Sequence, residues 1–294
     1  MDTRWLQAFI AVAEELHFGR AAAKLHIAQS PLSQIIRKLE KTLGSELFTR
    51  NTRSVELTAA GMTFLPYARE VLAQLETGRQ ATHAVAGEVV GRVRFGYSGV
   101  LNHVVLPGLV RAVHHQLPNV TLELVGRVLT QDAIVQLEQG MLDAACVGLP
   151  IEATDLSTRL LLAEPLGAVL PEDHPLAAEP AVAVAQLRGE PFITTSTSGG
   201  SALLQTTMRQ CADAGFRPTI VQEASDPYVV LLLVAGGVGV SLVTESIAPM
   251  MPPGAVYRPL HDATVTLEHG VAWSSRAPSP ALHAVLELVD HAIV

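Results

Sequence analysis

Residues 18–43 read FGRAAAKLHIAQSPLSQIIRKLEKTL, and this stretch decides the fold of the amino-terminal part of the 294-residue chain. Its alanine-rich start, Gly19–Leu25, has high helix propensity and little side-chain bulk, which predicts a short helix packed closely against a neighbour. A tight turn follows. A second helix is predicted with Ser30 as its N-cap and Pro31 as its first residue, and Gly44 provides a C-terminal stop.

The second helix has one apolar and one polar face. The apolar residues recur at the spacing of a single buried stripe: Leu32, Ile36, Leu39 and Leu43. The other face carries donors that contact base edges and phosphates in protein–DNA complexes: Gln29, Ser33, Gln34, Arg37 and Lys38. A polar helix face is usually only a solvated surface. The alanine-rich helix and tight turn before it favour an element that enters a DNA major groove.

The flanking segments extend this unit. Upstream, one helical face holds Trp5, Phe9, Val12 and Leu16, which predicts a third helix closing a small core. Downstream, residues 47–58 read LFTRNTRSVELT, two β-prone runs on either side of residues 51 and 52. This pattern indicates a wing whose Arg50 and Arg53 contact phosphates or a minor groove. An ordinary charged hairpin is the alternative.

Residues 1 to about 65 resemble the winged helix-turn-helix of LysR-type transcriptional regulators, through FIAVAEE, FGRAAAKLHIAQSPLS, IRKLE, LGSELFTR and LTAAG. The resemblance implies a double-stranded DNA operator as partner. It places on the recognition helix Gln29, Ser30, Pro31, Ser33, Gln34, Arg37 and Lys38, and on the wing Arg50 and Arg53. Members commonly have Arg and then Gln after the serine, whereas this chain has Gln34 and Ile35. One cationic contact is therefore missing, and the base preference of the family does not transfer directly.

The charge is unevenly distributed along the chain. Residues 1–90 hold ten Lys and Arg against nine Asp and Glu, whereas residues 91–294 hold ten against nineteen, within a formal net charge of −8. DNA affinity must therefore come from clustered arginines and from pairing of two copies rather than from bulk charge. A hydrophobic content of 49% over 294 residues is enough for more than one core.

The sequence also indicates the cellular compartment of the protein. The start MDTRW lacks the pattern of a secretion signal, and the longest apolar run, residues 228–243, is interrupted by three glycines. We expect no membrane association and a cytoplasmic location. Cys146 and Cys211 lie far apart without metal or redox spacing, which favours reduced, packed thiols. A redox switch stays open as an alternative.

A long helix is predicted over Thr58–Val85. Leu65, Ala68, Leu72 and Leu75 recur every three or four residues, the spacing of a pairing seam, and Pro66 should bend the helix. The resemblance implies the linker helix of the family, which dimerises and sets the spacing of two recognition helices. A plain connecting helix is the alternative. Gly87 and Gly91 mark a hinge into the next domain.

From Arg92 onward, strand and helix patterns alternate. Strands are predicted at residues 93–97, 120–124, 144–147, 166–170, 192–194, 220–222 and 238–243, separated by helically spaced runs, which indicates βαβ units with parallel strands. A looser LysR resemblance continues through LPNVTLEL, LPEDHPLA and LVAGGVGVSLV. It implies two Rossmann-like α/β subdomains of periplasmic-binding-protein type, with the chain crossing near Leu160–Glu164 and returning near Thr266–Gly270.

The resulting fold class is α/β with an N-terminal winged helix-turn-helix, a linker helix and two α/β subdomains. The expected domains are a DNA-binding domain at 1–58, a linker and dimerisation helix at 59–87, and an effector-binding domain at 91–294. Within the last, subdomain one comprises 91–161 and 267–294, and subdomain two comprises 162–266. By resemblance the chain assembles as a homodimer and further as a homotetramer, and RNA polymerase is a further partner.

Open α/β sheets bind ligands beyond the carboxyl ends of their strands, where helix N-termini offer unpaired N–H groups. This rule selects candidate effector-binding residues: Ser98, Gly99, Val100, Thr130, Gln131, Ser196, Gly199, Ser201, Asp226 and Tyr228. Such a set can hold a carboxylate without a lysine. The resemblance, nearest to regulators of aromatic-compound degradation, implies an aromatic acid or a dicarboxylate. A flexible connector at 194–201 and a simple N-cap at Thr130 stay open.

Motifs for catalysis are incomplete. GYSGV, residues 96–100, lacks the second glycine of a nucleophile elbow, and AGGVGV, residues 235–240, does not match the dinucleotide-binding fingerprint. The eleven histidines show no spacing typical of a metal site. We therefore expect no catalytic residue, metal or cofactor. Three hypotheses stay open: a ligand-responsive transcription factor, which the pattern favours, a solute-binding protein and a small-molecule enzyme.

Overall fold

A computed structural model describes residues 1–50, 54–85, 88–98, 101–195, 200–224, 226–276 and 278–289, with side chains described for all of these except residues 50, 84, 85, 101 and 102. The chain divides into two compact units. Unit one is Met1–Gly87 with Glu138–Met141, and unit two is Glu88–Leu137 with Leu142–Val294.

Unit one is a winged helix-turn-helix followed by one long helix. Its elements are α1 (Thr3–Glu15), α2 (Phe18–Lys24), α3 (Gln29–Leu43), the antiparallel wing strands β1 (Phe48–Arg50) and β2 (Val55–Leu57), and α4 (Ala59–Val85). The core is aromatic and aliphatic: the ring centroid of Phe9 lies 5.5 Å from that of Phe48 and 5.3 Å from that of Phe64. Leu32, Ile36 and Leu39 of α3 are fully buried, as their spacing predicts.

The start of α3 differs from the prediction. The helix begins at Gln29, and the N-cap is Ala28, which has an extended backbone and makes no side-chain cap. Ser30 and Pro31 are thus the second and third residues of α3. Proline is tolerated there because the N–H groups of a first helical turn have no partner within the helix. Gly44 does end the helix, in the left-handed region at φ 70°.

A second difference concerns Leu16. The sequence places it on the buried face of the first helix, but it is the residue that ends α1, with φ 46°, and 47% of its surface is exposed. The left-handed backbone there turns the side chain away from the stripe formed by Phe9 and Val12.

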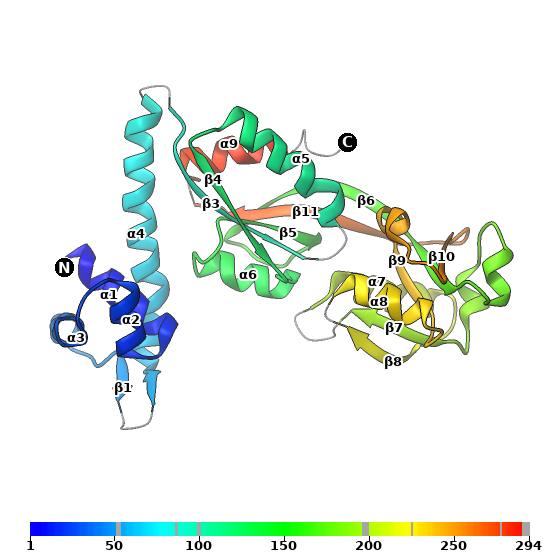
Figure 1. Cartoon of the computed structure of the whole chain (residues 1–294), viewed down its shortest axis with the longest axis horizontal. Helices are drawn as coiled ribbons and strands as arrows, with labels where there is room; N and C mark the ends of the chain where they lie inside the picture. Colours follow the sequence, from blue (N-terminus) through cyan, green and yellow to red (C-terminus); the bar gives the residue numbers. More distant parts are fainter. Residues whose placement is uncertain are drawn as a thin grey trace. The chain divides into compact units, whose positions relative to one another are not determined.

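The predicted seam on α4 is wrong for three of its four residues. Ala68 is fully buried, and Leu65 and Leu72 pack against the core formed by α1, α3 and the wing. The helix therefore uses this stripe to attach itself to its own domain, as Figure 1 shows at the lower half of α4. Its exposed apolar side chains include three that recur every four residues: Tyr67, Val71 and Leu75. Pro66 lies inside the continuous helix.

Unit two is built on a mixed sheet with the order β10-β6-β11-β5-β3-β4, to which β9 adds by pairing with β6. Its strands are β3 (Gly91–Tyr97), β4 (Val120–Gly126), β5 (Ala144–Leu149), β6 (Leu156–Pro171), β9 (Ser241–Thr244), β10 (Ala255–Pro259) and β11 (Thr266–Ser274). A separate parallel pair is formed by β7 (Pro191–Thr195) and β8 (Thr219–Ala224). The prediction of parallel strands holds for β3, β4 and β5 and for β7 with β8, whereas β6, β9, β10 and β11 pair antiparallel.

Two lobes share this unit, and we name them by their elements. Lobe one holds β3, β4 and β5 with α5 (Leu101–Gln116), α6 (Thr130–Glu138) and α9 (Pro280–Val289). Lobe two holds β7 to β10 with α7 (Ala202–Asp213), α8 (Pro227–Ala235) and the 3-10 helices η1 (Pro175–Ala178), η2 (Val184–Leu187) and η3 (Glu245–Met250). Figure 1 shows α5 and α9 on one face of the lobe-one sheet and α6 on the other, in agreement with their two separate cores.

The lobes are joined by β6 and β11, which we call the hinge strands. The first part of β6 pairs with β11 through residues 156–165, and its last part pairs with β9 and β10. The predicted crossings near Leu160–Glu164 and Thr266–Gly270 fall on these two strands. In the described part of the chain, no helix is long and apolar enough to cross a membrane.

Candidate functional site

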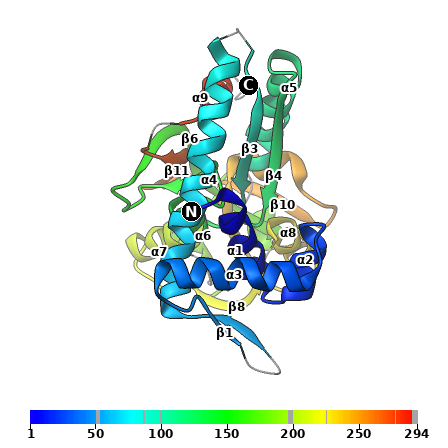
Figure 2. The same cartoon turned by 90° about the vertical axis from the view of Figure 1, so that its left-hand side faces the viewer.

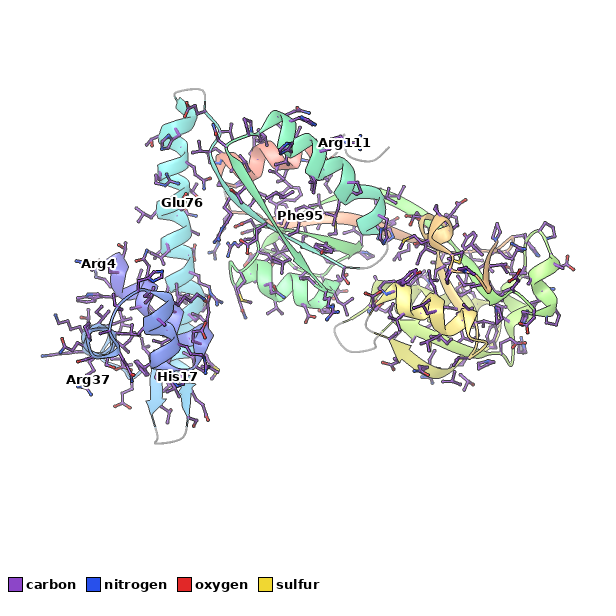
Figure 3. All side chains as sticks on the ribbon, viewed as in Figure 1. Arg4, His17, Arg37, Glu76, Phe95 and Arg111 are labelled. Atoms are coloured by element: carbon purple, nitrogen blue, oxygen red, sulfur yellow. The ribbon has the colours of Figure 1, made fainter. Side chains whose placement is uncertain are left out.

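The outward face of α3 presents most of the predicted DNA contacts to solvent. Gln29, Ser30, Pro31, Gln34, Arg37 and Lys38 are exposed, and Ser33 is half-buried. Ile35 is half-buried and packs against the core, so its side chain belongs to the fold rather than to this face. Figure 2 shows α3 lying in front of α1, with the wing strands below it, and Figure 3 shows Arg37 on the side of α3 away from α4.

In the described part of unit one, the positive charge that no carboxylate neutralises lies on α3. The paired cations of unit one lie elsewhere: Arg4 with Asp2 at 2.6 Å, Arg20 with Glu15 at 3.2 Å, Lys24 and Arg69 with Glu14 at 2.9 and 3.3 Å, and Arg79 with Glu76 at 2.6 Å. Among the described residues, Arg37, Lys38 and Lys41 form no ion pair with a carboxylate. Lys41, which sequence reasoning missed, lies four residues after Arg37 and extends the same row.

Two hydrogen-bonded side chains position this helix pair and its wing. The Nδ1 atom of His17 accepts from the backbone N–H groups of Gly19 at 3.0 Å and Arg20 at 3.2 Å, and so caps α2. The Oε1 atom of Glu40 accepts from the backbone N–H groups of Leu47 at 3.0 Å and Phe48 at 3.4 Å. Glu40 thereby ties α3 to the first wing strand. The predicted wing contacts, the side chains of Arg50 and Arg53, lie outside the described residues.

Of the predicted effector residues that the structure describes, Thr130, Gln131 and Ser201 lie where the two lobes meet. Ser98 directly follows β3, and Thr130 begins α6. The hydroxyl oxygen of Thr130 accepts a hydrogen bond from the backbone N–H of Gly148 at 3.0 Å. Thr130 therefore does more than start a helix, because its hydroxyl joins α6 to the carboxyl end of β5.

Two close approaches bring lobe two against this edge. A Cβ atom built on Gly148 would lie 2.2 Å from the Cβ of Ala202 at the start of α7. A Cβ atom built on Gly200, whose φ is +69°, would lie 2.2 Å from Cγ of Gln131. The glycines thus let the start of α7 meet the start of α6 and the end of β5. We call this junction the interlobe edge.

Ser201 is the buried polar member of the junction from lobe two. Its hydroxyl accepts from the backbone N–H of Leu204 at 3.3 Å, which caps α7, and lies 3.0 Å from the Thr195 hydroxyl. Asp226 follows the carboxyl end of β8 and caps α8 by accepting from the backbone N–H of Tyr228 at 2.8 Å. The remaining predicted residues, Gly99, Val100, Ser196 and Gly199, lie outside the described residues.

One cation close in sequence to the interlobe edge was missed by sequence reasoning. Arg127 follows β4 and precedes Thr130 by three residues, and its side chain is exposed. Its backbone is left-handed, with φ 63°, a conformation that is strained for a residue with a Cβ atom. The only trace of this in the sequence is its place between Gly126 and the start of a helix. Within the described residues, no group of three or more His, Cys, Asp and Glu side chains is placed to hold a metal ion.

Comparisons with known proteins match both the helix-turn-helix and the α/β unit to one family. Residues 3–62 match the model of the bacterial regulatory helix-turn-helix protein, lysR family, and residues 86–293 match the model of the LysR substrate binding domain. A curated relative, the HTH-type transcriptional regulator ShiR of Corynebacterium glutamicum, is 49% identical over 288 residues, covering 98% of each chain.

Solved structures of full-length regulators have the same fold. A full-length OxyR variant from Pseudomonas aeruginosa is 26% identical with a TM-score of 0.79, covering 100% of this chain and 94% of the other. Full-length CbnR complexed with its target DNA is 25% identical with a TM-score of 0.75, covering 99% of this chain and 100% of the other. The chain belongs to the LysR family of DNA-binding transcriptional regulators with an effector-binding domain.

Proposed function

We propose that this regulator responds to a small carboxylate, such as an aromatic acid or a dicarboxylate, bound at the interlobe edge. The observation that carries the proposal is the close approach of the starts of α6 and α7, which brings neutral donors together, with an exposed cation three residues before α6. Ser98, Thr130 and Ser201 supply hydroxyl groups, Gln131 supplies an amide, and Arg127 supplies positive charge that no carboxylate neutralises among the described residues. Helix N-termini at Thr130 and Ala202 add backbone N–H groups, which favour an anion.

The same proposal keeps the remaining predicted effector-binding residues: Gly99, Val100, Ser196, Gly199, Asp226 and Tyr228. The effector changes the angle between the lobes, and the oligomer passes this change to the spacing of two recognition helices and the bend of the operator. The chain acts by binding rather than by catalysis, in the cytoplasm, where it meets its operator and RNA polymerase.

On the DNA side, we propose that Gln29, Ser30, Pro31, Ser33 and Gln34 contact base edges, and that Arg37, Lys38, Arg50 and Arg53 contact phosphates or the minor groove. Pairing of two copies uses the row Tyr67, Val71 and Leu75 of α4, because these apolar side chains are exposed to solvent in the monomer. Two recognition helices then read two half-sites. A homotetramer forms from two such dimers.

The test of the effector proposal is a calorimetric titration of the full chain with a panel of small aromatic acids and dicarboxylates, each paired with its neutral amide. We expect one or more acids to bind and their amides to fail. Arg127→Gly removes the cation and relaxes the left-handed backbone, so it should fold at least as well and bind the acid at least tenfold more weakly. The control for the loss of one surface cation is Arg276→Gly, at an exposed bend of the chain. Equal binding of acid and amide would contradict the proposal.

A further inference from the structure

A buried carboxylate and a half-buried imidazole lie on the two hinge strands. Glu164 of β6 pairs with Leu267 of β11, and His269 is two residues further along β11. Residues directly opposite each other on antiparallel strands share a face, and so do residues two apart on one strand. Glu164 and His269 are therefore diagonal neighbours on one face of the hinge.

Both side chains hold a buried polar atom with no partner in the described residues. Glu164 is 5% exposed, and its Oε2 accepts from the backbone N–H of Ser246 at 2.9 Å, which leaves Oε1 unpaired. The Nε2 atom of His269 is also buried and unpaired. Buried polar groups in native proteins nearly always have a partner, so two orphaned atoms on neighbouring strands require an explanation.

The position of Glu164 and His269 on the hinge strands explains why these two atoms are unpaired. The register of β6 and β11 shifts between His269 and Gly270, so the strands carry a β-bulge directly beside the pair. A bulge locally disrupts the ladder and bends the strand. Glu164 is bonded to η3 of lobe two through Ser246, whereas His269 is itself paired with Gly148 of β5 in lobe one. A change in lobe angle therefore changes the separation of Glu164 and His269.

We propose that Glu164 and His269 are a proton-dependent latch: in a second lobe arrangement, protonated His269 donates its Nε2–H to Oε1 of Glu164 and holds the lobes at that angle. The bond satisfies both orphaned atoms at once. It is charge-assisted when the imidazole carries protons on both ring nitrogens and the carboxylate is ionised, so its formation takes up one proton relative to the neutral imidazole. The inference rests on the proposed effector site only in that it makes the lobe angle, which the effector controls, respond to pH as well.

The sign of the pH dependence follows from the two environments of His269. In the described arrangement, burial lowers the pKa of the imidazole, and the Glu164 carboxylate acts in the opposite direction. The imidazole is therefore neutral at neutral pH. Direct bonding to Glu164 would favour the protonated form. A fall in pH must then shift the population toward the bonded arrangement, because that arrangement holds the proton more tightly than the described one.

Other titratable groups around the pair do not supply this response. Burial, then Glu245 and Glu164, raise the pKa of Tyr257 on β10 to about 12, so the phenol stays protonated. Burial also raises the pKa of Cys146 on β5 to about 12 and that of Cys211 on α7 to about 11. Two arginines on these strands, Arg159 of β6 and Arg258 of β10, are half-buried. Five further titratable groups on the packed elements are exposed to solvent: Glu245 of η3, His103 of α5, Arg209 and Asp213 of α7, and Glu268 of β11.

The experiment measures the lobe angle without effector or DNA. Spin labels are placed at Arg111→Cys on α5, which Figure 3 shows on the outer side of lobe one, and at exposed Arg209→Cys on α7 of lobe two. The native thiols are buried and do not compete for the label. Distances are measured by pulsed electron resonance in the full chain, diluted with unlabelled protein, from about pH 8 to about pH 5. We expect a second distance to appear as the pH falls.

Glu164→Gln and His269→Gln should each abolish that second distance. His283→Gln is the matched control, because His283 lies 3.3 Å from Glu287 in an exposed pair on α9 and should leave the response unchanged. If Glu164→Gln does not fold, Glu164→Asp keeps the charge, shortens its reach and should lower the acid-induced fraction. A wild-type distance that does not change with pH, a response that persists in both pair variants, or one that His283→Gln also removes would overturn the latch. None of these results depends on finding the effector.

Discussion

The hydroxyl of Thr130 accepts a hydrogen bond from the backbone N–H of Gly148 at 3.0 Å, which fastens the start of α6 to the end of β5. The oxygen is occupied by this bond, whereas the hydroxyl hydrogen is available to donate. A single side chain thus sets the edge of lobe one and offers a donor at the place proposed for the effector.

Thr130→Val should lower the free energy of unfolding of the α/β unit by about 1–2 kcal/mol, because it leaves the Gly148 N–H without its acceptor. It should also weaken effector binding. Thr130→Ser keeps the hydroxyl and should restore both quantities. Chemical denaturation and calorimetric titration measure them. Equal stability of the valine and serine variants would show that the bond contributes nothing.

Gly148→Ala should disturb the interlobe edge without disrupting either lobe. The added Cβ would lie 2.2 Å from the Cβ of Ala202, closer than any real contact, so the start of α7 must move away. We expect effector affinity to fall at least tenfold. Ala202→Gly removes the opposing atom, so the double variant should recover most of the affinity. If Gly148→Ala binds normally, or if Ala202→Gly gives no rescue, the two residues do not determine the edge.

Arg37→Ala should weaken DNA binding across sequences and make the dependence of log K on log salt shallower by about one unit for each phosphate that the protein no longer neutralises. Arg37 has no carboxylate partner in the described residues, so its charge is available to DNA. Arg79→Ala is the matched control, because Arg79 is paired with Glu76 at 2.6 Å on α4. Fluorescence anisotropy with labelled operator DNA gives both slopes. Equal slopes for the two variants would contradict the assignment of Arg37.

Val71→Asp should prevent pairing of α4 helices, because it places a charge in the exposed apolar row with Tyr67 and Leu75. Ala73→Asp is the control: Ala73 is also exposed but lies on the opposite side of the helix. Sedimentation velocity of the full chain should show loss of the larger species for Val71→Asp alone. If Ala73→Asp dissociates the protein and Val71→Asp does not, the pairing face is elsewhere on α4.

The two thiols should be unreactive in the folded protein. Burial raises the pKa of Cys146 to about 12 and that of Cys211 to about 11, so almost no thiolate is present near neutral pH. An unfolded thiol ionises near its ordinary value of 9.0, whereas the folded thiols stay protonated well above it. Stability is therefore unaffected below that value and should fall as the pH rises above it. Rapid labelling by a thiol reagent at neutral pH, without unfolding, would favour the redox alternative.

Local patterns predicted the helix-turn-helix well. Leu32, Ile36 and Leu39 are buried because a helical stripe in a three-helix unit has only one core to face. The position of the helix start was wrong, since the backbone leaves the helix at Ala28 and no side chain is needed to cap it. Polar residues favour caps without fixing them.

Features that depend on tertiary contacts were not predictable. The stripe at Leu65, Ala68 and Leu72 has the spacing of a dimer seam, yet the winged-helix core covers it. Periodicity identifies an apolar face but not its partner. Glu164 and His269 are about a hundred residues apart in sequence, and only the pairing of β6 with β11 brings them together. The left-handed Arg127 likewise follows from the geometry of the loop between β4 and α6.

The central claim is that α3 is one of two recognition helices in a DNA-binding dimer, and that the affinity for DNA depends on the cations of its outward face. The most direct measurement is footprinting of the full chain on DNA upstream of its own gene, for wild type and Arg37→Ala side by side. The account predicts two protected half-sites about one helical turn, or a whole number of turns, apart for wild type, and weaker protection for the variant at the same salt. An unprotected upstream region for wild type, or identical protection by both proteins, would contradict it.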